Sequence, residues 1–451
     1  MGNTFFILKK SIRNHTNGGT VLMAATALAL LVVNLPFLHD FYNGLWTHEI
    51  ALQVGNFNLF SHHGHPMSVM AFINDALMAV FFFAVGLEIK REVLDGELSS
   101  FRQALLPIVA AIGGMIVPVG IFMLFARGTD YMQGAAIPMA TDIAFSLGVL
   151  AMLGKRVPLG LKIFLTTLAV VDDIGGILVI AIFYSAEIHV TPLLIGAAIL
   201  ALLFLGGKAG VQFKTFYVTF GIIVWFLFLQ SGIHPTIAGV LVAFCVPARP
   251  VYAPKKYIKT IRRNISHFSQ ADEEILDKRG ILSKDQTNWL KEIESASDKV
   301  ISPLQDMEDA LHPVVNYIIV PLFAFANAGI WLGNVNVADI FSGISIAVIA
   351  GLVGGKFLGI FLFSWLCVKT RMAPMPEGST WPQIAAVSVL GGIGFTVSLF
   401  IANLTFGTGD PYLSTLLNNA KLGILIGSVL AGFLGWFFLN LTLPRHGRSG
   451  Q

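Results

Sequence analysis

The stretch LAVVDDIGGI, from Leu168 to Ile177, places two adjacent aspartates inside an apolar run that extends from residue 159 to residue 184. An apolar run of about 20 residues is long enough to cross a lipid bilayer as a helix. An ionised carboxylate at the centre of such a helix costs roughly 3 kcal/mol or more, so charges there are a functional-site hypothesis. The stretch therefore predicts a membrane span that carries a functional site.

The composition of the whole chain supports the same class. Of 451 residues, 55% are hydrophobic and only 12% are charged, whereas soluble domains average about 25% charged residues. The mean hydropathy is +0.74. The net charge of +3 includes no long basic stripe, which argues against a nucleic-acid partner. We expect an all-α integral membrane protein that contacts membrane lipid.

Apolar runs of spanning length occur about twelve times, and we treat residues 1–451 as one transmembrane domain. The predicted spans lie near 20–38, 69–94, 104–125, 135–153, 159–184, 191–207, 212–229, 231–247, 312–333, 341–368, 383–405 and 414–440. Three short spans are crowded between residues 191 and 247.

The loops between these spans alternate in charge. One set is nearly free of basic residues, with Arg127 as the exception. The other set carries Lys90, Arg91, Arg102, Lys155, Arg156, Lys208, Lys214, Lys369, Arg371, Arg445 and Arg448. Because basic loops stay in the cytoplasm, we predict that both chain termini are cytoplasmic.

Two connecting segments have patterns of their own. Residues 49–60, EIALQVGNFNLF, alternate apolar and polar residues around Gly55, which predicts a β-hairpin on the outer face rather than a plain loop. A hairpin edge can pair with a second protomer, so we expect a homodimer formed there. Residues 249–311 have mixed charge and helical periodicity, which predicts a solvated, helical cytoplasmic loop.

Ionisable residues occur in several of the predicted spans. Besides Asp172 and Asp173, these are Asp142, Lys356, Asp75, Glu88, Lys90, Arg91 and Glu92. Adjacent helical residues point about 100° apart, so Asp172 and Asp173 cannot both face one partner. Lys356 is the only lysine at comparable depth, and we expect it to pair with one aspartate while the other faces a cavity. A purely structural ion-pair network is the alternative.

Two of the spans also look interrupted. Pro138 and the polar pair Thr141–Asp142 break the run 135–153, and Gly391, Gly392 and Gly394 fall within five residues of the run 383–405. Interrupted spans in both halves of a chain point to a transporter's binding site. Half-helices carry partial charge at their ends, which an anion such as Asp142 or a cation such as Lys356 would offset. Close helix packing is the alternative role for the glycines.

The motifs together resemble the NhaA family of sodium/proton antiporters over nearly the whole chain. The motifs are NDALMAVFF, VGLEIKRE, AIPMATDIAFSLGVLAMLGKRVPLGLKIFL, LAVVDDIGG, HPTIAGV, LHPVVNYIIVPLFAFANAGI and GGIGFTVSLFIANLTFG. The resemblance implies twelve helices, inverted repeats formed by spans 3–5 and 10–12, and broken helices that cross in spans 4 and 11. It also implies a bacterial inner membrane.

The resemblance implies roles for individual residues. Asp173 would be the main ligand shared by sodium and protons, and Asp172 its partner, alternating with a salt bridge to Lys356. Thr141 and Asp142 would lie at the helix break beside the cation. Acidic positions of the cytoplasmic funnel and positions tied to the pH response would be Asp75, Glu88, Glu92, His234 and Glu308. Residues 249–311 are longer than the family pattern.

A buried carboxyl group suits this chemistry because burial disfavours its charged form, so it holds either a proton or a cation. A second ionisable group allows two protons to enter for each sodium ion that leaves, which makes the exchange electrogenic. We expect transport of Na⁺ and Li⁺, regulation by pH, no cofactor and no enzymatic activity. A cation channel with structural acidic residues remains the alternative, whereas an ATP-driven pump lacks its phosphate-binding loop because GGKAG and GGKFLG fail the motif.

Overall fold

The computed structural model is mainly helical. It describes residues 18–51, 53–54, 57–58, 60–62, 65–184, 188–249, 254–270, 284–298, 300–331, 333, 341, 343–407 and 410–444. Within these ranges, eight helices are long and apolar enough to cross a membrane. They are α4–η1–α5 (Val69–Asp95), α6 (Phe101–Phe125), α8 (Leu159–Phe183), α9 (Val190–Lys208), α10 (Lys214–Ser231), α15–η5–α16 (Pro303–Asn327), α18–η7–α19 (Gly343–Lys369) and α22 (Pro411–Thr442).

Three further pairs of helices are bent at a short break. The angles are 114° between α2 (Gly18–Asn34) and α3 (Pro36–Thr47), 42° between η3 (Asp130–Met139) and α7 with η4 (Ile143–Arg156), and 41° between α20 (Trp381–Leu390) and α21 (Phe395–Phe406). The first bend has a local cause: Leu35 precedes Pro36, and a residue before proline disfavours the helical conformation. The interruptions predicted in runs 135–153 and 383–405 are therefore present.

The predicted number of about twelve spans is higher than the helix lengths support. If each bent pair is one span, the described residues contain up to eleven. The difference lies at residues 231–247, where α11 (Thr236–Cys245) has only ten residues. Gly232 takes a left-handed conformation, with φ of 81°, and ends α10 directly after Ser231. Composition could not show that this apolar run begins with a turn.

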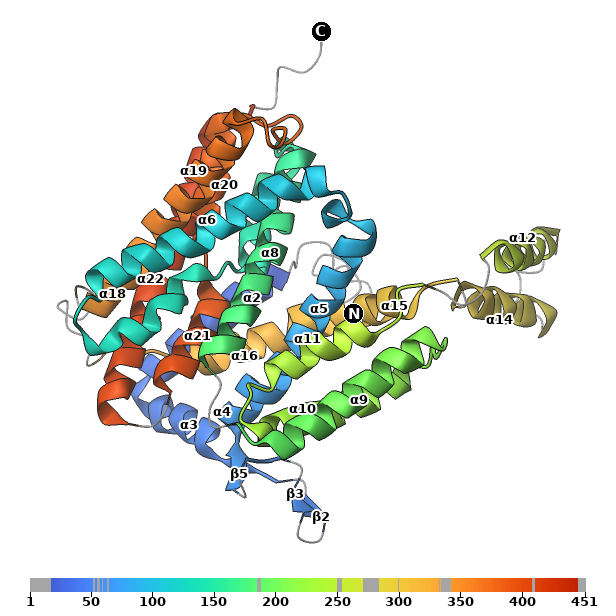
Figure 1. Ribbon diagram of the computed structural model, residues 1–451, viewed down its shortest axis with the longest axis horizontal. Coiled ribbons are helices and arrows are strands. Elements are labelled where there is room, and N and C mark those ends of the chain that lie inside the picture. Colours follow the sequence, from blue (N-terminus) through green and yellow to red (C-terminus); the bar gives the residue numbers. More distant parts are fainter. Residues whose placement is uncertain are drawn as a thin grey trace, which may run out of the picture.

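The helices pack around two hydrophobic cores. One core joins α5 (Met78–Asp95) to α9, α10 and α11, with Leu87, Tyr217 and Val224 fully buried. The larger core joins α2, α6, α8, α16 (Val320–Asn327) and α18 to α22. Figure 1 shows α9, α10 and α11 at the lower right and most helices of the larger core at the left, with α5 between these two sets.

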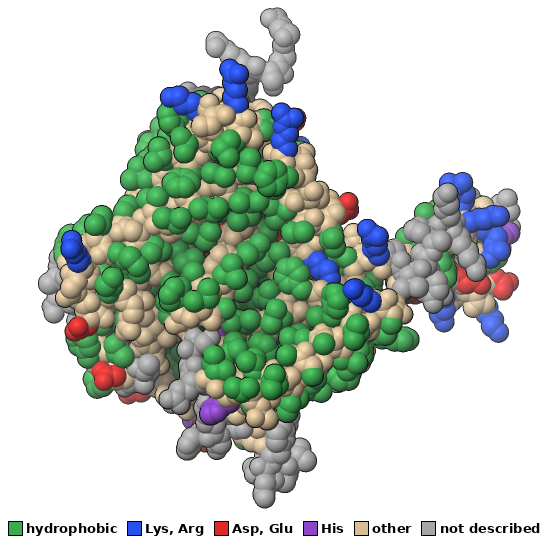
Figure 2. All heavy atoms as spheres, viewed as in Figure 1, with side chains coloured by type: hydrophobic (Ala, Val, Ile, Leu, Met, Phe, Trp, Pro, Cys, Tyr) green, Lys and Arg blue, Asp and Glu red, His purple; other side chains and the backbone are tan. Residues whose placement is uncertain are grey.

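The outer surface of these helices is apolar. Side chains such as Leu124, Ile182, Phe183, Leu194 and Phe213 are 64–79% exposed. Figure 2 shows that hydrophobic side chains cover most of the visible face, while most Lys and Arg side chains lie at its top, near the base of the projecting arm and on the arm. A soluble monomer rarely exposes so continuous an apolar surface, so this face fits contact with lipid.

A small β-structure follows α3. Strands β2 (Gln53–Val54) and β3 (Phe57–Asn58) pair antiparallel, with Val54 opposite Phe57, so the hairpin predicted within residues 49–60 is present. A three-stranded sheet of β1 (Glu49–Ile50), β5 (His65–Ser68) and β4 (Ser61–His62) was not predicted. Gly55, at the predicted turn, lies outside the described residues.

Most of the described residues in the charged segment 249–311 are helical. Helices α12 (Pro254–Gln270) and α14 (Lys284–Asp298) form the arm at the right of Figure 1. Asn264 Nδ2 donates to Glu292 Oε2 at 2.8 Å, and the rings of His267 and Trp289 stack. Residues 271–283, between the two helices, lie outside the described ranges.

Three of the long spans contain a π-helical turn. These turns are η1 (Ile73–Leu77), η5 (Val315–Ile319) and η7 (Ala350–Gly355). Such wide turns within α-helices are rare and frequently mark functional sites. Here η1 contains Asp75, and η7 ends directly before Lys356.

Candidate functional site

The two broken spans meet at their interruptions. The backbone N–H of Asp142 donates to the carbonyl of Ile393 at 2.6 Å, and the Thr141 hydroxyl donates to the carbonyl of Gly391 at 2.8 Å. The Ser146 hydroxyl donates to Leu390 O at 3.2 Å. Backbone groups that a continuous helix would satisfy internally are thus bonded across the crossing, as backbone buried in a membrane requires.

Asp142 joins the N-terminal ends of two half-helices. Its Oδ1 accepts from the backbone N–H of Phe145, in the first turn of α7, at 3.0 Å. Its Oδ2 accepts from the backbone N–H and the hydroxyl of Thr396, in the first turn of α21, at 3.1 and 2.7 Å. The aspartate is only 3% exposed. A carboxylate here offsets the partial positive charge of both helix ends, as expected from the sequence.

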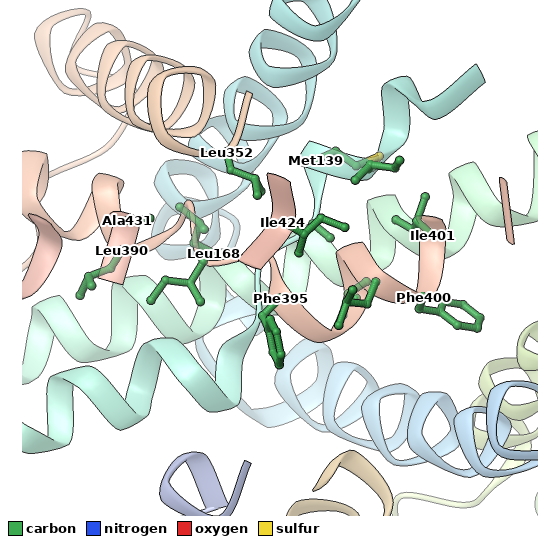
Figure 3. Close-up of a cluster of buried hydrophobic side chains, with 14 of the residues drawn as sticks. Met139, Leu168, Leu352, Leu390, Phe395, Phe400, Ile401, Ile424 and Ala431 are labelled. Atoms are coloured by element: carbon green, nitrogen blue, oxygen red, sulfur yellow. The ribbon is translucent and has the colours of Figure 1, made fainter. Parts of the chain in front are cut away.

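The glycines of the second break permit close approach. Gly391 and Gly394 have φ of −58° and −97°, which other residues adopt freely. A Cβ at Gly392 would collide with the carbonyl of Leu352, and one at Gly394 would collide with Ser398 Oγ. Figure 3 shows Leu352, Leu390 and Ile424 gathered around this segment. The glycines thus lie at the interruption itself, and two of them also allow the close packing that was their alternative role.

Pro138 has a similar place in the first break. It is buried in η3, three residues before Thr141. A Cβ on Gly351 of η7 would approach Pro138 Cβ to 2.6 Å. The span that carries Lys356 thus lies directly against the interrupted segment.

Asp172 and Lys356 form a buried ion pair. Lys356 Nζ donates to Asp172 Oδ2, and both side chains are completely shielded from solvent. Among the described residues no donor bonds the other oxygen, Asp172 Oδ1. Lys356 is thus the cation that holds the carboxylate, and the Thr141 hydroxyl lies beside it. The second oxygen, Oδ1, is available to accept a proton or a cation.

Asp173 lies on the wall of a cavity. The cavity has a volume of about 160 Å³. Its polar lining consists of Asp173, Glu88, Thr141, Asp142, Glu308, His312, Asn316 and Thr396. Neighbouring aspartates on α8 thus face different surroundings, one the lysine and the other the cavity, in agreement with their 100° separation.

Acidic side chains line the cavity where α5 meets α15 (Pro303–Val314). Glu88 and Glu308 both line it. Arg91 forms an ion pair with Glu308 and a second pair with Glu92 at 3.0 Å. The Glu92 carboxylate also accepts from the backbone N–H of Glu97 at 3.1 Å. Glu88, Glu92 and Glu308 therefore form one group beside the cavity.

Asp75 and His234 lie apart from this group. Asp75 is thirteen residues before Glu88 on the same span, which is about 20 Å along a helix. It faces His234, with 3.6 Å between Oδ1 and Nε2. The placement of Asp75 beside Glu88 in one funnel, implied by the resemblance, does not match this geometry. Neither Asp75 nor His234 lines the cavity.

Thr396 is a site residue that sequence analysis missed. It bonds Asp142 through two groups and lines the cavity. The signal was present, because Thr396 is the first hydroxyl residue after the three glycines of the break. Within the described ranges, no three His, Cys, Asp or Glu side chains are close enough to hold one metal ion. A cation bound at Asp173 would therefore need hydroxyl, carbonyl or water oxygens as well.

Comparison with known proteins agrees with this arrangement. A family model described as Na⁺/H⁺ antiporter 1 matches residues 9–439. The chain belongs to this family. A relative from Phocaeicola vulgatus, named Na(+)/H(+) antiporter NhaA, is 55% identical over 98% of this chain and 97% of its own length. Relatives with the same name from Bacteroides fragilis and Oleidesulfovibrio alaskensis are 54% and 44% identical, over 94% and 95% of this chain and 96% and 92% of their own lengths.

Membership in this antiporter family sets the class of the protein. The chain is a multi-pass membrane protein that transports small cations, and it is not an enzyme. The cavity beside Asp173, the Asp172–Lys356 pair and the crossing at Asp142 are the features from which its transport chemistry is argued below.

Proposed function

We propose that the chain expels Na⁺, and also Li⁺, in exchange for protons that bind the same carboxylate, Asp173. The observation that carries the proposal is the position of Asp173 on the wall of a cavity inside a membrane span. Burial disfavours an unpaired negative charge, so the carboxylate holds either a proton or a cation. Competition for one group couples the two ions without a separate gate.

The surrounding oxygens suit an alkali cation. Hard cations prefer carboxylate, hydroxyl and carbonyl oxygens. The Thr141 hydroxyl donates its proton to Gly391 O, which leaves its own oxygen free to act as a ligand. The unbonded Oδ1 of Asp172 provides a second anionic oxygen. Asp142 takes a different role, because both of its oxygens already accept hydrogen bonds from the half-helices.

The Asp172–Lys356 pair supplies the second proton. When a cation draws Asp172 toward it, Lys356 loses its buried counter-charge and releases a proton. Exchange of two protons for one sodium ion moves one net charge in each cycle. That charge gains about 2.3 kcal/mol per 100 mV of membrane potential, which helps expel sodium against its gradient.

Movement of the crossing relative to the rest of the protein would expose Asp173 to each side in turn. The proposed arrangement has inverted repeats in spans 3–5 and 10–12, a common design of secondary transporters. We further propose a bacterial inner membrane, with both termini in the cytoplasm on the basis of the basic loops. Regulation by pH would act through two groups of residues. One is Glu88, Glu92 and Glu308 beside the cavity, and the other is the Asp75–His234 pair further along the span of α5.

Proton flux in proteoliposomes tests the exchange. Added Na⁺ is expected to release protons through the unmodified protein, and Asp173→Asn is expected to abolish this flux while the protein stays folded. Asp285→Asn, on the exposed arm, is the control that keeps full flux. Full sodium-dependent proton flux through Asp173→Asn would refute the role of Asp173. Sodium current without proton return would favour the channel alternative.

A homodimer through the hairpin region is the last part of the proposal. Strands β2 and β3 form a two-stranded antiparallel sheet, and the edge of such a sheet can pair with a strand of a second protomer. Replacement of residues 53–58 by a flexible turn is expected to shift the purified protein from dimer to monomer in light scattering. An unchanged dimer would place the interface elsewhere.

A further inference from the structure

A group of buried aromatic rings lies at the end of the cavity that is away from Glu88 and Glu308. Phe82 of α5, Phe323 of α16 and Phe400 of α21 are at most 2% exposed. The ring centroid of Phe400 is 5.8 Å from that of Phe82 and 6.2 Å from that of Phe323. The three rings come from three different spans and meet at Phe400, so together they close the space between those spans.

Two of the rings lie about one turn beyond a cavity residue on their own spans. Phe323 lies three residues beyond Val320, and Phe400 lies four residues beyond Thr396. Phe82 is instead adjacent to Phe81 and lies at its depth. Phe81, Val320 and Thr396 all line the cavity. Spacings of three and four residues keep a helical side chain on the same face and advance it by about one turn. Phe323 and Phe400 therefore lie directly behind the cavity, and Phe82 contacts Phe400 from the depth of Phe81.

A chain of three asparagines forms the next layer. Asn403 Nδ2 donates to Asn327 Oδ1 at 2.9 Å, and Asn327 Nδ2 donates to Asn74 Oδ1 at 3.0 Å. Asn327 is completely buried. Buried amide groups inside a membrane are costly unless they are hydrogen-bonded, so their presence calls for a role.

The asparagines lie further along the same three spans, about one turn beyond Phe323 and Phe400 and about two turns beyond Phe82. Asn74, Asn327 and Asn403 are each seven residues from the cavity residues Phe81, Val320 and Thr396 on the same spans. Seven residues are two helical turns, or about 10 Å, on nearly the same face. In all three spans the direction leads away from Glu88 and Glu308. Asn403 belongs to the crossing helix α21, whereas its partners belong to the spans of α5 and α16.

We propose that Phe82, Phe323 and Phe400, backed by the Asn74–Asn327–Asn403 chain, are the closed gate between the cavity and the far side of the membrane. Apolar constrictions stop ions and water by excluding water. The asparagine chain fastens α21 to the two other spans, and its bonds must separate when the crossing moves. This inference rests on the proposed exchange, because only alternating exposure requires a gate on this side.

Thiol labelling from the two sides of the membrane tests the gate. In a background of Cys245→Ser and Cys367→Ser, Ala84→Cys places a reporter on the cavity wall. A membrane-impermeant maleimide is expected to label the reporter from the cavity side and slowly from the far side. Asn403→Leu is expected to raise the far-side rate about threefold, the factor for one interhelical hydrogen bond in a bilayer.

The ring layer has a matched control. Phe400→Ala is expected to raise the far-side rate at least threefold, whereas Phe122→Ala, an equally buried ring on α6 outside this layer, should leave it unchanged. Unchanged cavity-side labelling shows that each variant is folded. Far-side rates at the starting value in both Phe400→Ala and Asn403→Leu would overturn the gate. Loss of sodium-dependent proton flux in the unmodified protein would instead overturn the proposed exchange, because labelling does not depend on flux.

Discussion

Replacement of Lys356 by methionine tests how strongly the buried ion pair is desolvated. The side chains of Lys356 and Asp172 are both completely shielded from solvent. Lys356→Met keeps a long, flexible side chain but leaves the Asp172 charge without its partner. Removal of one member of a buried pair costs about 3–5 kcal/mol of unfolding free energy. We expect a loss of this size in denaturant-induced unfolding of the purified protein in detergent.

The double variant Asp172→Asn with Lys356→Met separates charge from packing. It replaces the pair by neutral side chains of similar volume, a change that is often neutral or stabilising. We therefore expect it to recover about 3 kcal/mol relative to Lys356→Met. Lys214→Met is the control, since the Lys214–Asp306 pair is 50% and 34% exposed and such pairs contribute about 1 kcal/mol or less. Equal losses in Lys356→Met and Lys214→Met would refute the reasoning.

Three further predictions concern the crossing and the energetics. Asp142→Asn removes the charge that serves two helix ends, and we expect it to lower the unfolding free energy by about 1–3 kcal/mol. Its control is Asp410→Asn at an exposed helix start, which should lower the unfolding free energy by only about 0.3 kcal/mol because asparagine caps nearly as well as aspartate. Gly392→Ala forces a Cβ against the carbonyl of Leu352 and should cost about 1–3 kcal/mol, whereas Gly354→Ala, with open space at its Cβ, should be neutral or slightly stabilising. If one net charge moves per cycle, a potential of 100 mV should change the steady-state sodium ratio across a vesicle about 50-fold; a ratio that ignores voltage would show an electroneutral exchange.

The charged centre of the site follows closely from the sequence. The period of an α-helix separates Asp172 from Asp173, and the depth of Lys356 leaves it as the natural partner of one of them. The interruptions at Thr141 and Gly391 follow from proline, glycine and polar residues within apolar runs. The interruptions are features of single spans and can be read from their residues. The pairing of Lys356 follows because an unpaired charge inside a membrane is costly, which leaves few possible partners.

Features that depend on contacts between distant spans could not be predicted in this way. The bonds from Thr396 to Asp142 and from Asn403 to Asn327 depend on how helices dock, which no pattern within one span encodes. The π-helical turns are equally hidden, because a single wide turn leaves the apolar pattern almost unchanged. The span predicted at residues 231–247 stays unconfirmed, because α11 has only ten residues and the apolar run before it contains the turn at Gly232.

The two helix ends held by Asp142 have a mechanical consequence. Because one carboxylate bonds the first turns of both α7 and α21, neither half-helix can shift alone without breaking a bond inside the membrane. Displacement of one must carry the other along, together with the residues on both of them. The crossing is thus a single stiff piece, and flexibility during turnover belongs to its borders with neighbouring helices.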